Sequence, residues 1–229
     1  YLKSMSNFTN HLNKIQKQIK TSASKAKRDK DNIQLVAVSK KQPIERIQNA
    51  LDAGQRLFGE NRVQEAYTHW QDIRCNNTYP ELCLHLIGPL QSNKAADAVA
   101  LFDVMHSLDR EKIARVMADE QEKQGRRLQY FIQVNTGEEH EKSGILPKDL
   151  ESFYKTATET YGLNVVGLMC LPPVDEAAGL HFALLAKLAK GLGIAKLSMG
   201  MSDDYDLAVQ FGATHLRVGS ALFGARPQS

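Results

Sequence analysis

The sequence contains few cysteines, and their arrangement excludes two common structural roles. Cys75, Cys83 and Cys170 are odd in number and lack the paired spacing of zinc ligands, so they fit neither a disulfide framework nor a cysteine metal site. Unpaired thiols are typical of a reducing compartment. We therefore expect three thiols.

Long apolar runs are also missing. No segment of about 18 or more apolar residues occurs, and the first residues lack the apolar segment of a secretory signal. These absences predict a soluble, cytoplasmic protein with no membrane partner. Residues 1–4 precede Met5, and we expect them to be a cloning remnant with Met5 as the natural first residue.

A strong charge of either sign is absent too, since the net charge is +3. Basic residues gather between positions 14 and 30, but Leu12, Ile15 and Ile19 lie among them at helical spacing. This pattern favours a solvated amphipathic helix over the alternative, a polyanion site. The aromatic residues that single-strand binders place between such charges are lacking there. We expect no nucleic-acid partner.

Short β-rich runs alternate with helical stretches along the whole chain, without a linker or a shift in composition. About eight such units predict a single (β/α)8 TIM-barrel domain, 1–229, over an open doubly wound sheet. Little sequence follows the last strand, so the leading helix, 7–26, is expected to fill that gap in the outer ring. The expected strands are 34–39, 56–58, 84–87, 104–106, 129–134, 165–169, 196–199 and 215–218. The other expected helices are 44–53, 62–72, 109–124, 148–161, 176–190 and 204–211.

Lys40 ends the first expected strand, a run of apolar residues followed by a lysine. The carboxyl ends of barrel strands are where ligands are held. An amine with few water neighbours has a depressed pKa and becomes a nucleophile toward aldehydes. The alternative for Lys40 alone is a strand-ending lysine whose amine reaches solvent.

The segment after the last expected strand has the composition of a phosphate cradle. Gly219 and Ser220 open a short stretch with helical potential, and Ser198 with the turn 199–202 brings further donors from the preceding strand. In barrels the loops after strands seven and eight often bind phosphate through backbone N–H groups. The alternative is that these glycines only shape turns.

An amine and a phosphate cradle on one rim fit an aldehyde that carries a phosphate, and pyridoxal 5′-phosphate is such a molecule. A lysine imine, or Schiff base, is its standard attachment. Arg217 lies where an inward side chain would meet the pyridine nitrogen, and arginine stays protonated. Such a contact disfavours carbanion chemistry. A structural ion pair is the alternative role for Arg217.

The ordered motifs of the chain resemble one protein family. They comprise Val38-Ser39-Lys40, Gly59-Glu60-Asn61-Arg62-Val63-Gln64-Glu65, His85-Leu86-Ile87-Gly88-Pro89-Leu90-Gln91-Ser92-Asn93-Lys94, Gln133-Val134-Asn135-Thr136, Lys142-Ser143-Gly144, Gly167-Leu168-Met169, Leu197-Ser198-Met199-Gly200-Met201-Ser202, Arg217-Val218-Gly219-Ser220 and Phe223-Gly224-Ala225-Arg226. Over nearly the whole chain the sequence resembles the pyridoxal phosphate homeostasis proteins, or YggS-like family, which are related to the N-terminal barrel of alanine racemase. One departure is Leu84, where the family usually has tryptophan.

The resemblance implies a role for each matching residue. Lys40 is implied to form the imine, Arg217 to face the ring nitrogen, and Ser198, Gly219 and Ser220 to hold the phosphate. The further residues implied to surround the cofactor are Asn61, His85, Met169 and Met199.

Metal and thiol chemistry are less favoured. His85, His106 and His215 lie at or near strand ends, but their surroundings offer no zinc pattern, so we expect no metal site. Cys170 has no adjacent base and is expected to be a packed thiol.

Racemisation needs two bases on opposite faces of the substrate carbon, and in alanine racemase one of them comes from a C-terminal domain for which no sequence follows here. We therefore expect a protein that stores or hands on pyridoxal phosphate in vitamin B6 homeostasis without turnover. We also expect a monomer, with apo-enzymes that use pyridoxal phosphate as recipients. Two alternatives stay open: an enzyme such as a weak amino-acid racemase, and a phosphorylated-sugar or aldolase-type barrel that uses Lys40 without pyridoxal.

Overall fold

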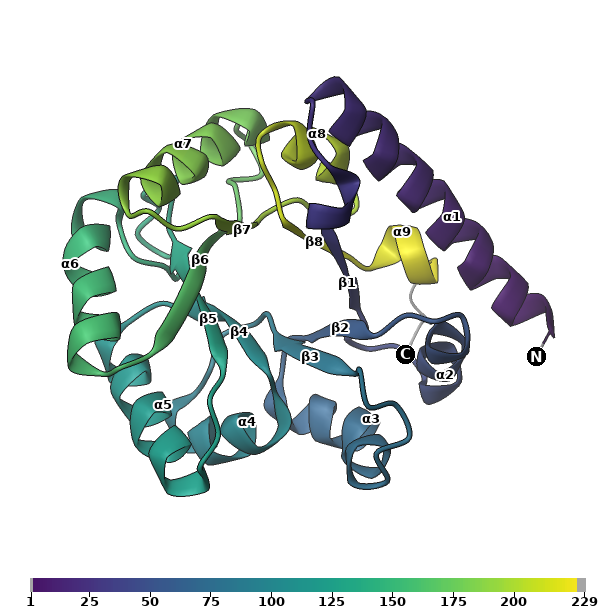
Figure 1. The fold of residues 1–229 in the computed structure, drawn as a ribbon, viewed down its shortest axis with the longest axis horizontal. Helices are drawn as coiled ribbons and strands as arrows, with labels where there is room; N and C mark the ends of the chain where they lie inside the picture. Colours follow the sequence, from purple (N-terminus) through teal and green to yellow (C-terminus); the bar gives the residue numbers. More distant parts are fainter. Residues whose placement is uncertain (1, 226–229) are drawn as a thin grey trace.

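The chain folds into a closed barrel of parallel strands, as seen in Figure 1. The computed structural model describes residues 2–225 and the side chains of residues 7–225. Tyr1, the first residue of the expected cloning remnant, and Arg226, the last residue of the final motif, lie outside this range. The strands are β1 (Gln34–Val38), β2 (Leu57–Glu60), β3 (Cys83–Leu86), β4 (Val104–Leu108), β5 (Gln129–Val134), β6 (Asn164–Cys170), β7 (Lys196–Ser198) and β8 (His215–Val218).

Helices surround the barrel and follow the strands in turn, which confirms the predicted (β/α)8 architecture. Among the described residues, none of the helices combines the length and apolar character needed to cross a membrane. The α-helices are α1 (Leu2–Lys25), α2 (Ile44–Asp52), α3 (Val63–Cys75), α4 (Ala95–Leu101), α5 (Glu111–Gln124), α6 (Leu150–Lys155), α7 (Ala178–Gly191), α8 (Tyr205–Gln210) and α9 (Ser220–Phe223). The 3-10 turns are η1 (Lys30–Asn32), η2 (Ser92–Lys94) and η3 (Pro147–Asp149), and η4 (Thr156–Thr160) is a π-helical turn.

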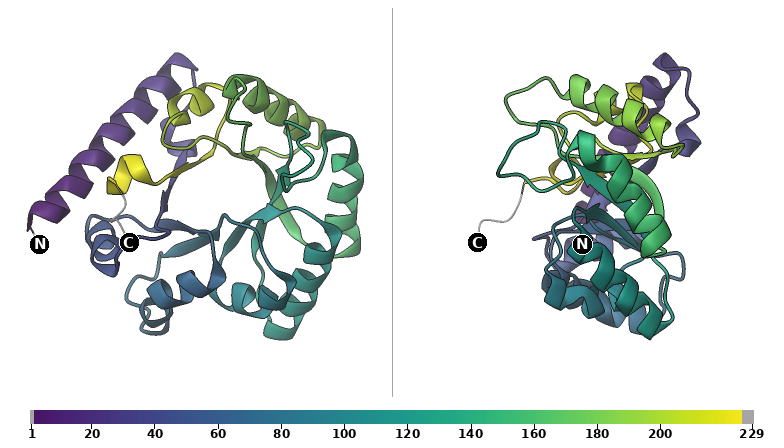
Figure 2. Two further views of the ribbon diagram at one scale, coloured as in Figure 1. Left: turned by 180° about the vertical axis from the view of Figure 1, so that it is seen from behind. Right: turned by 90° about the vertical axis from the view of Figure 1, so that its left-hand side faces the viewer.

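The leading helix completes the outer ring, as the sequence predicted. α1 packs against α2, α8 and α9, and Figure 2 shows it outside the barrel in the view from behind. Phe8, Leu12, Ile15 and Ile19 are buried on its inner face at helical spacing, while the lysines at positions 14, 17, 20 and 25 are exposed. The short α9 alone would leave a gap in the outer ring beside β8 and β1, and α1 closes this gap by packing on α2, α8 and α9.

The structure differs from the sequence prediction at two helices. The sequence analysis missed α4, because its seven residues are mostly alanine and give little amphipathic pattern. The expected helix 148–161 is divided into η3, α6 and η4, and its last turn widens to a π-helix before Gly162, which has φ +61°.

The core lies mainly between the sheet and the helices. Phe58 and Trp70 are fully buried there, with ring centroids 4.7 Å apart. Inside the barrel a smaller apolar cluster of Val104, Phe131 and Met169 fills one part, and polar side chains fill the rest. The interior is therefore packed, with an unusual share of polar groups for a barrel core.

Gly167 in β6 tests this packing. A Cβ atom at this position would lie 2.4 Å from the Lys196 carbonyl oxygen and 2.5 Å from the Phe131 ring. We expect Gly167→Ala to lower the free energy of unfolding by about 1–3 kcal/mol in urea titrations, because backbone and ring must shift. Gly191→Ala is the matched control, since a Cβ there meets nothing within 4 Å. An equal effect of both substitutions would contradict the packing argument.

Candidate functional site

Closure of the barrel makes the first and last strands neighbours. β1 pairs with β8 in parallel, with Val36 opposite Arg217 and Ala37 opposite Val218. Lys40 follows β1 by two residues, and Gly219 follows β8 directly. A Cβ added at Gly219 would lie 3.4 Å from that of Val38. The expected amine and the expected cradle therefore extend from adjacent strands at the same edge of the barrel.

The backbone around Lys40 is held on both sides by carboxylates. Ser39 donates its N–H to the Gly59 carbonyl oxygen (3.0 Å) and its hydroxyl to Glu60 (2.7 Å). The N–H of Lys41 donates to Glu65. Lys41 has φ +57°, a left-handed conformation that is unfavourable for a residue with a Cβ. These contacts hold the turn, and with it the partly buried Lys40, in a defined place.

Glu60 is the fully buried acceptor in this support. The same carboxylate oxygen receives Ser39, the His69 ring (2.9 Å) and the Trp70 indole N–H (3.0 Å). Its other oxygen has no partner among the described residues. Burial lowers the pKa of His69, but the hydrogen bond and charge of Glu60, with the charge of Glu65, outweigh burial and raise that pKa overall.

Glu60, Glu65 and His69 also form the one group in the described part of the chain whose ligand atoms, within 4.8 Å of one another, could hold a metal ion. Their hydrogen bonds to Ser39, Lys41 and Trp70 already account for this arrangement. Glu60 was noted in the sequence only as part of a motif. Its signal in the sequence was a carboxylate two residues after the end of the expected strand 56–58.

The cradle consists of the turn after β7 and the start of α9. Gly200 has φ +93°, and a Cβ there would lie 2.6 Å from that of Ala208, so this position requires glycine. The turn brings the Ser202 hydroxyl within 3.1 Å of the Ser220 hydroxyl and 3.3 Å of the Ala221 N–H. Two hydroxyls and backbone N–H groups thus gather beside Gly219.

Arg217 is buried at the base of this edge, with 4% of its surface exposed. Nη1 donates to the Ser198 hydroxyl (2.5 Å) and Nη2 to the Cys170 carbonyl oxygen (2.9 Å). Burial lowers the pKa of the guanidinium, although the charges of Cys170 and Asp204 oppose that shift. None of the ion pairs within the described residues involves Arg217. A buried guanidinium that has no carboxylate partner favours contact with an electron-rich hydrogen-bond acceptor.

Three histidines lie inside the barrel, each no more than 4% exposed. Burial lowers the pKa of His85 and of His215 to about 3, and nearby positive charge adds to the effect. Burial likewise brings the pKa of His106 well below its ordinary value. All three rings are therefore neutral at pH 7. Sequence reasoning treated His106 only as a metal candidate and missed its contact with Ser198, 2.7 Å from Nδ1 to Oγ.

The other expected site residues fall into different places. Asn61 lines a cavity of about 340 Å³ together with Gly88, Gln133 and Asn135, which follow or end other strands. Met169 lies inside the barrel against Phe131. The Met199 side chain instead packs in the core outside the sheet, so only its backbone can face the rim.

Ser198 differs from its expected environment. Its hydroxyl is fully buried and contacts Arg217 and His106, whereas the Ser220 hydroxyl contacts Ser202. The donors of the cradle therefore include Ser202, a residue the sequence analysis had placed in the turn without assigning it a contact.

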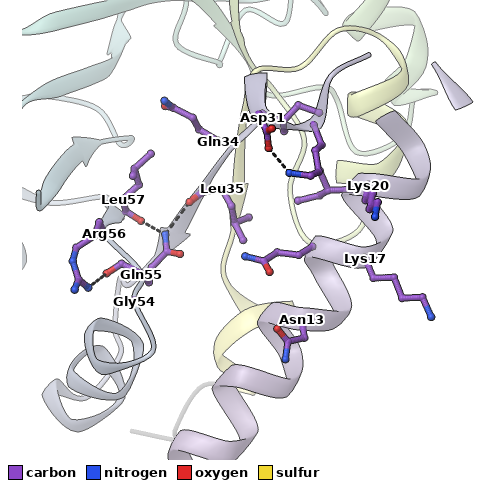
Figure 3. A pocket seen from close by; sticks show the side chains of 14 residues that line it. Asn13, Lys17, Lys20, Asp31, Gln34, Leu35, Gly54, Gln55, Arg56 and Leu57 are labelled. Carbon is purple, nitrogen blue, oxygen red and sulfur yellow. Dashed lines mark hydrogen bonds and ion pairs between the residues drawn. The ribbon is translucent and has the colours of Figure 1, made fainter. Parts of the chain in front are cut away.

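A cavity of about 700 Å³ lies at the opposite end of the barrel, between α1 and the starts of β1 and β2. Figure 3 shows Lys17 and Lys20 extending from α1 away from the strands. Arg56 donates to the Leu51 and Gln55 carbonyl oxygens, and Gln55 joins the backbones of Leu35 and Leu57. This end of the barrel carries structural bonds, as is usual for the amino-terminal face.

Comparison with known proteins identifies the family. Residues 11–227 match the family described as alanine racemase, N-terminal domain. The pyridoxal phosphate homeostasis protein of Vibrio cholerae is 39% identical over 235 residues, which cover 98% of this chain and 99% of that protein. The chain belongs to the pyridoxal phosphate homeostasis protein family.

Solved structures agree with this assignment. PipY of Synechococcus elongatus, in a structure with pyridoxal phosphate (PLP) bound, is 35% identical with a TM-score of 0.76, covering 90% of this chain and 100% of that chain. An alanine racemase of Clostridium difficile is 14% identical with a TM-score of 0.73, covering 98% of this chain and 58% of that chain. The racemase likeness concerns the fold alone.

The buried histidines predict a loss of stability in acid. An unfolded histidine takes up a proton near pH 6.5, whereas folded His85 and His215 do so only near pH 3. Between these values the unfolded chain binds more protons than the folded chain. The free energy of unfolding should therefore decrease by about 1.4 kcal/mol for each pH unit that the solution is made more acidic, for each such ring. Urea titrations from pH 4.5 to 7.5 measure this slope.

The His215→Phe variant should have a slope that is shallower by about one proton. The exposed His140→Phe variant controls for the loss of one histidine from the chain. A slope that is the same in His215→Phe and wild type would contradict the assignment of a neutral buried ring at position 215.

Proposed function

We propose that this protein binds pyridoxal 5′-phosphate at the β1–β8 edge, holds it covalently through Lys40, and acts in vitamin B6 homeostasis without catalytic turnover. The observation that carries the proposal is the combination of Lys40 and Gly219–Ser220 on adjacent strands with a buried, carboxylate-free Arg217 beneath them. The names of the curated relatives and the PLP-bound structure of PipY support it.

Each residue would meet a different part of the cofactor. The Lys40 amine would bond to the aldehyde carbon, and the hydroxyl of Ser220 with the backbone N–H groups after Gly219 would donate to the phosphate. Arg217 would donate to the unprotonated ring nitrogen. Asn61, His85 and Met169 would line the surroundings, as would the Met199 backbone. The cofactor, when bound, supplies an electrophilic carbon and an electron sink.

The proposed contact of Arg217 supports the proposed absence of turnover. A guanidinium cannot give up its proton to the ring nitrogen, so the ring would stay uncharged and would stabilise a carbanion poorly. The alternative is a PLP-dependent enzyme such as a weak amino-acid racemase. We further propose that the protein is a cytoplasmic monomer that passes the cofactor to apo-enzymes, which sedimentation and transfer assays would test.

Covalent attachment gives the first test. Purified protein with added PLP should show a visible absorption band, and borohydride should trap one pyridoxyl group on Lys40, located by peptide mass analysis. Lys40→Ala should lose both the band and the adduct. Lys41→Ala is the matched control and should retain them, because the bond from residue 41 to Glu65 uses the backbone N–H. A trapped group on another lysine would contradict the assignment.

Incubation with single amino-acid enantiomers tests turnover. We expect the wild type to leave enantiomer ratios unchanged over many equivalents. Arg217→Glu should raise any residual α-proton exchange, measured by NMR in heavy water, because a carboxyl group can share a proton with the ring nitrogen. If the wild type sustains racemisation and Lys40→Ala abolishes it, the carrier proposal is wrong and the protein is an amino-acid racemase.

A further inference from the structure

A continuous line of polar contacts crosses the barrel interior from Arg217. Its guanidinium donates to the Ser198 hydroxyl at 2.5 Å, and this hydroxyl lies 2.7 Å from Nδ1 of His106. Nε2 of His106 lies 2.8 Å from Nδ1 of His85, and Nε2 of His85 lies 3.3 Å from Sγ of Cys83. The four residues that follow Arg217 in this line come from β7, β4 and β3, so the line runs from β8 and its neighbour β7 across the interior to β4 and β3.

The direction of these hydrogen bonds is set at the Arg217 end. A guanidinium can only donate, so the Ser198 oxygen accepts and its own O–H needs an acceptor. Nδ1 of His106 is the acceptor within reach, which places the His106 proton on Nε2. The Nε2–H of His106 then donates to Nδ1 of His85. This places the His85 proton on Nε2, where it faces Sγ of Cys83. The opposite direction would leave the buried Ser198 O–H without an acceptor, which is unfavourable.

The environment keeps both imidazoles uncharged, as this direction requires. His85 and His106 are fully enclosed, and burial together with the positive charge of Lys196 near His85 and of Arg217 near His106 lowers the pKa of each ring. The His106 ring also stacks on Phe131, with centroids 4.4 Å apart and planes at 23°. The ring is therefore fixed by packing on its face and by hydrogen bonds at both nitrogens.

We infer that Ser198, His106 and His85 are positioning residues that hold the Arg217 guanidinium in the orientation needed to donate to the cofactor's ring nitrogen. This inference rests on the proposed function. Arg217 has five N–H groups, and two are engaged with Ser198 and the Cys170 carbonyl oxygen. With two fixed points the planar group cannot rotate. Without the Ser198 bond it would pivot about a single contact.

The test uses PLP and its analogue in which carbon replaces the ring nitrogen. Arg217 can donate to the first and not to the second, while aldehyde and phosphate are unchanged. Ser198→Ala and His106→Phe should weaken the binding of PLP by about 10-fold, as expected for a disturbed charged hydrogen bond. Both variants should bind the carbon analogue within about 2-fold of wild type. Ser107→Ala is the matched control, because Ser107 is a buried serine that donates to the Gly88 carbonyl oxygen outside this line.

Each outcome has a distinct meaning. Equal weakening of both ligands would show a general structural role and overturn the inference, as would undiminished binding of PLP by both variants. A wild-type protein that binds neither compound would overturn the proposed function itself. A wild type that binds both equally tightly would exclude the ring-nitrogen contact and overturn the inference while leaving the carrier function intact.

A second measurement needs no variant. In 15N NMR spectra of the wild type at pH 6, His85 and His106 should both be neutral with the proton on Nε2. A proton on Nδ1 of either ring, or an imidazolium, would contradict the direction of the hydrogen bonds from Arg217 and overturn the inference.

Discussion

Parallel hydrogen bonding between β1 and β8, from Gln34 opposite His215 to Ala37 opposite Val218, closes the barrel and creates the candidate site. Lys40 and Arg217 lie near opposite ends of the chain, and no local interaction could bring them together. Register matters as much as closure, because a shift by one residue would turn Arg217 out of the interior. The covering of this seam by α1 is therefore part of the site's support, since α1 packs on the helices on either side of it.

Electrostatics in the interior follow from the burial of one cation. Arg217 stays charged, so the groups beside it must be able to accept or must be neutral. Ser198, the Cys170 carbonyl oxygen and the neutral histidines meet this condition, and a carboxylate in contact would compete for the guanidinium. The fully buried carboxylate of Glu60 instead supports the turn at Lys40, together with side chains from α3. The opposite charges thus serve different parts of the rim.

The sequence allowed the fold and most of the rim to be predicted because both depend on simple patterns. The apolar run that ends in Lys40 and the strand that contains Arg217 show their burial and direction directly, and the bounds of β5 and β8 agree with the prediction. α4 was missed because alanine has weak amphipathic contrast. The contacts of Ser198 and His106 could not be predicted, since they join β7, β4 and β8 and depend on inward alternation across a register shift in β4.

The interior that we propose holds the cofactor in a carrier would also disfavour carbanion chemistry on it. A racemase needs the cofactor's ring to accept negative charge during proton removal, and that acceptance is strongest when the ring nitrogen is protonated. An arginine held by Ser198 and Cys170 and surrounded by neutral rings cannot supply this proton, and no carboxylate is in contact with it within the described residues. Binding strength and chemical inertness would therefore have one cause, the fixed guanidinium. In such a site a change that improved catalysis at the ring nitrogen would also disturb the contact that holds the cofactor.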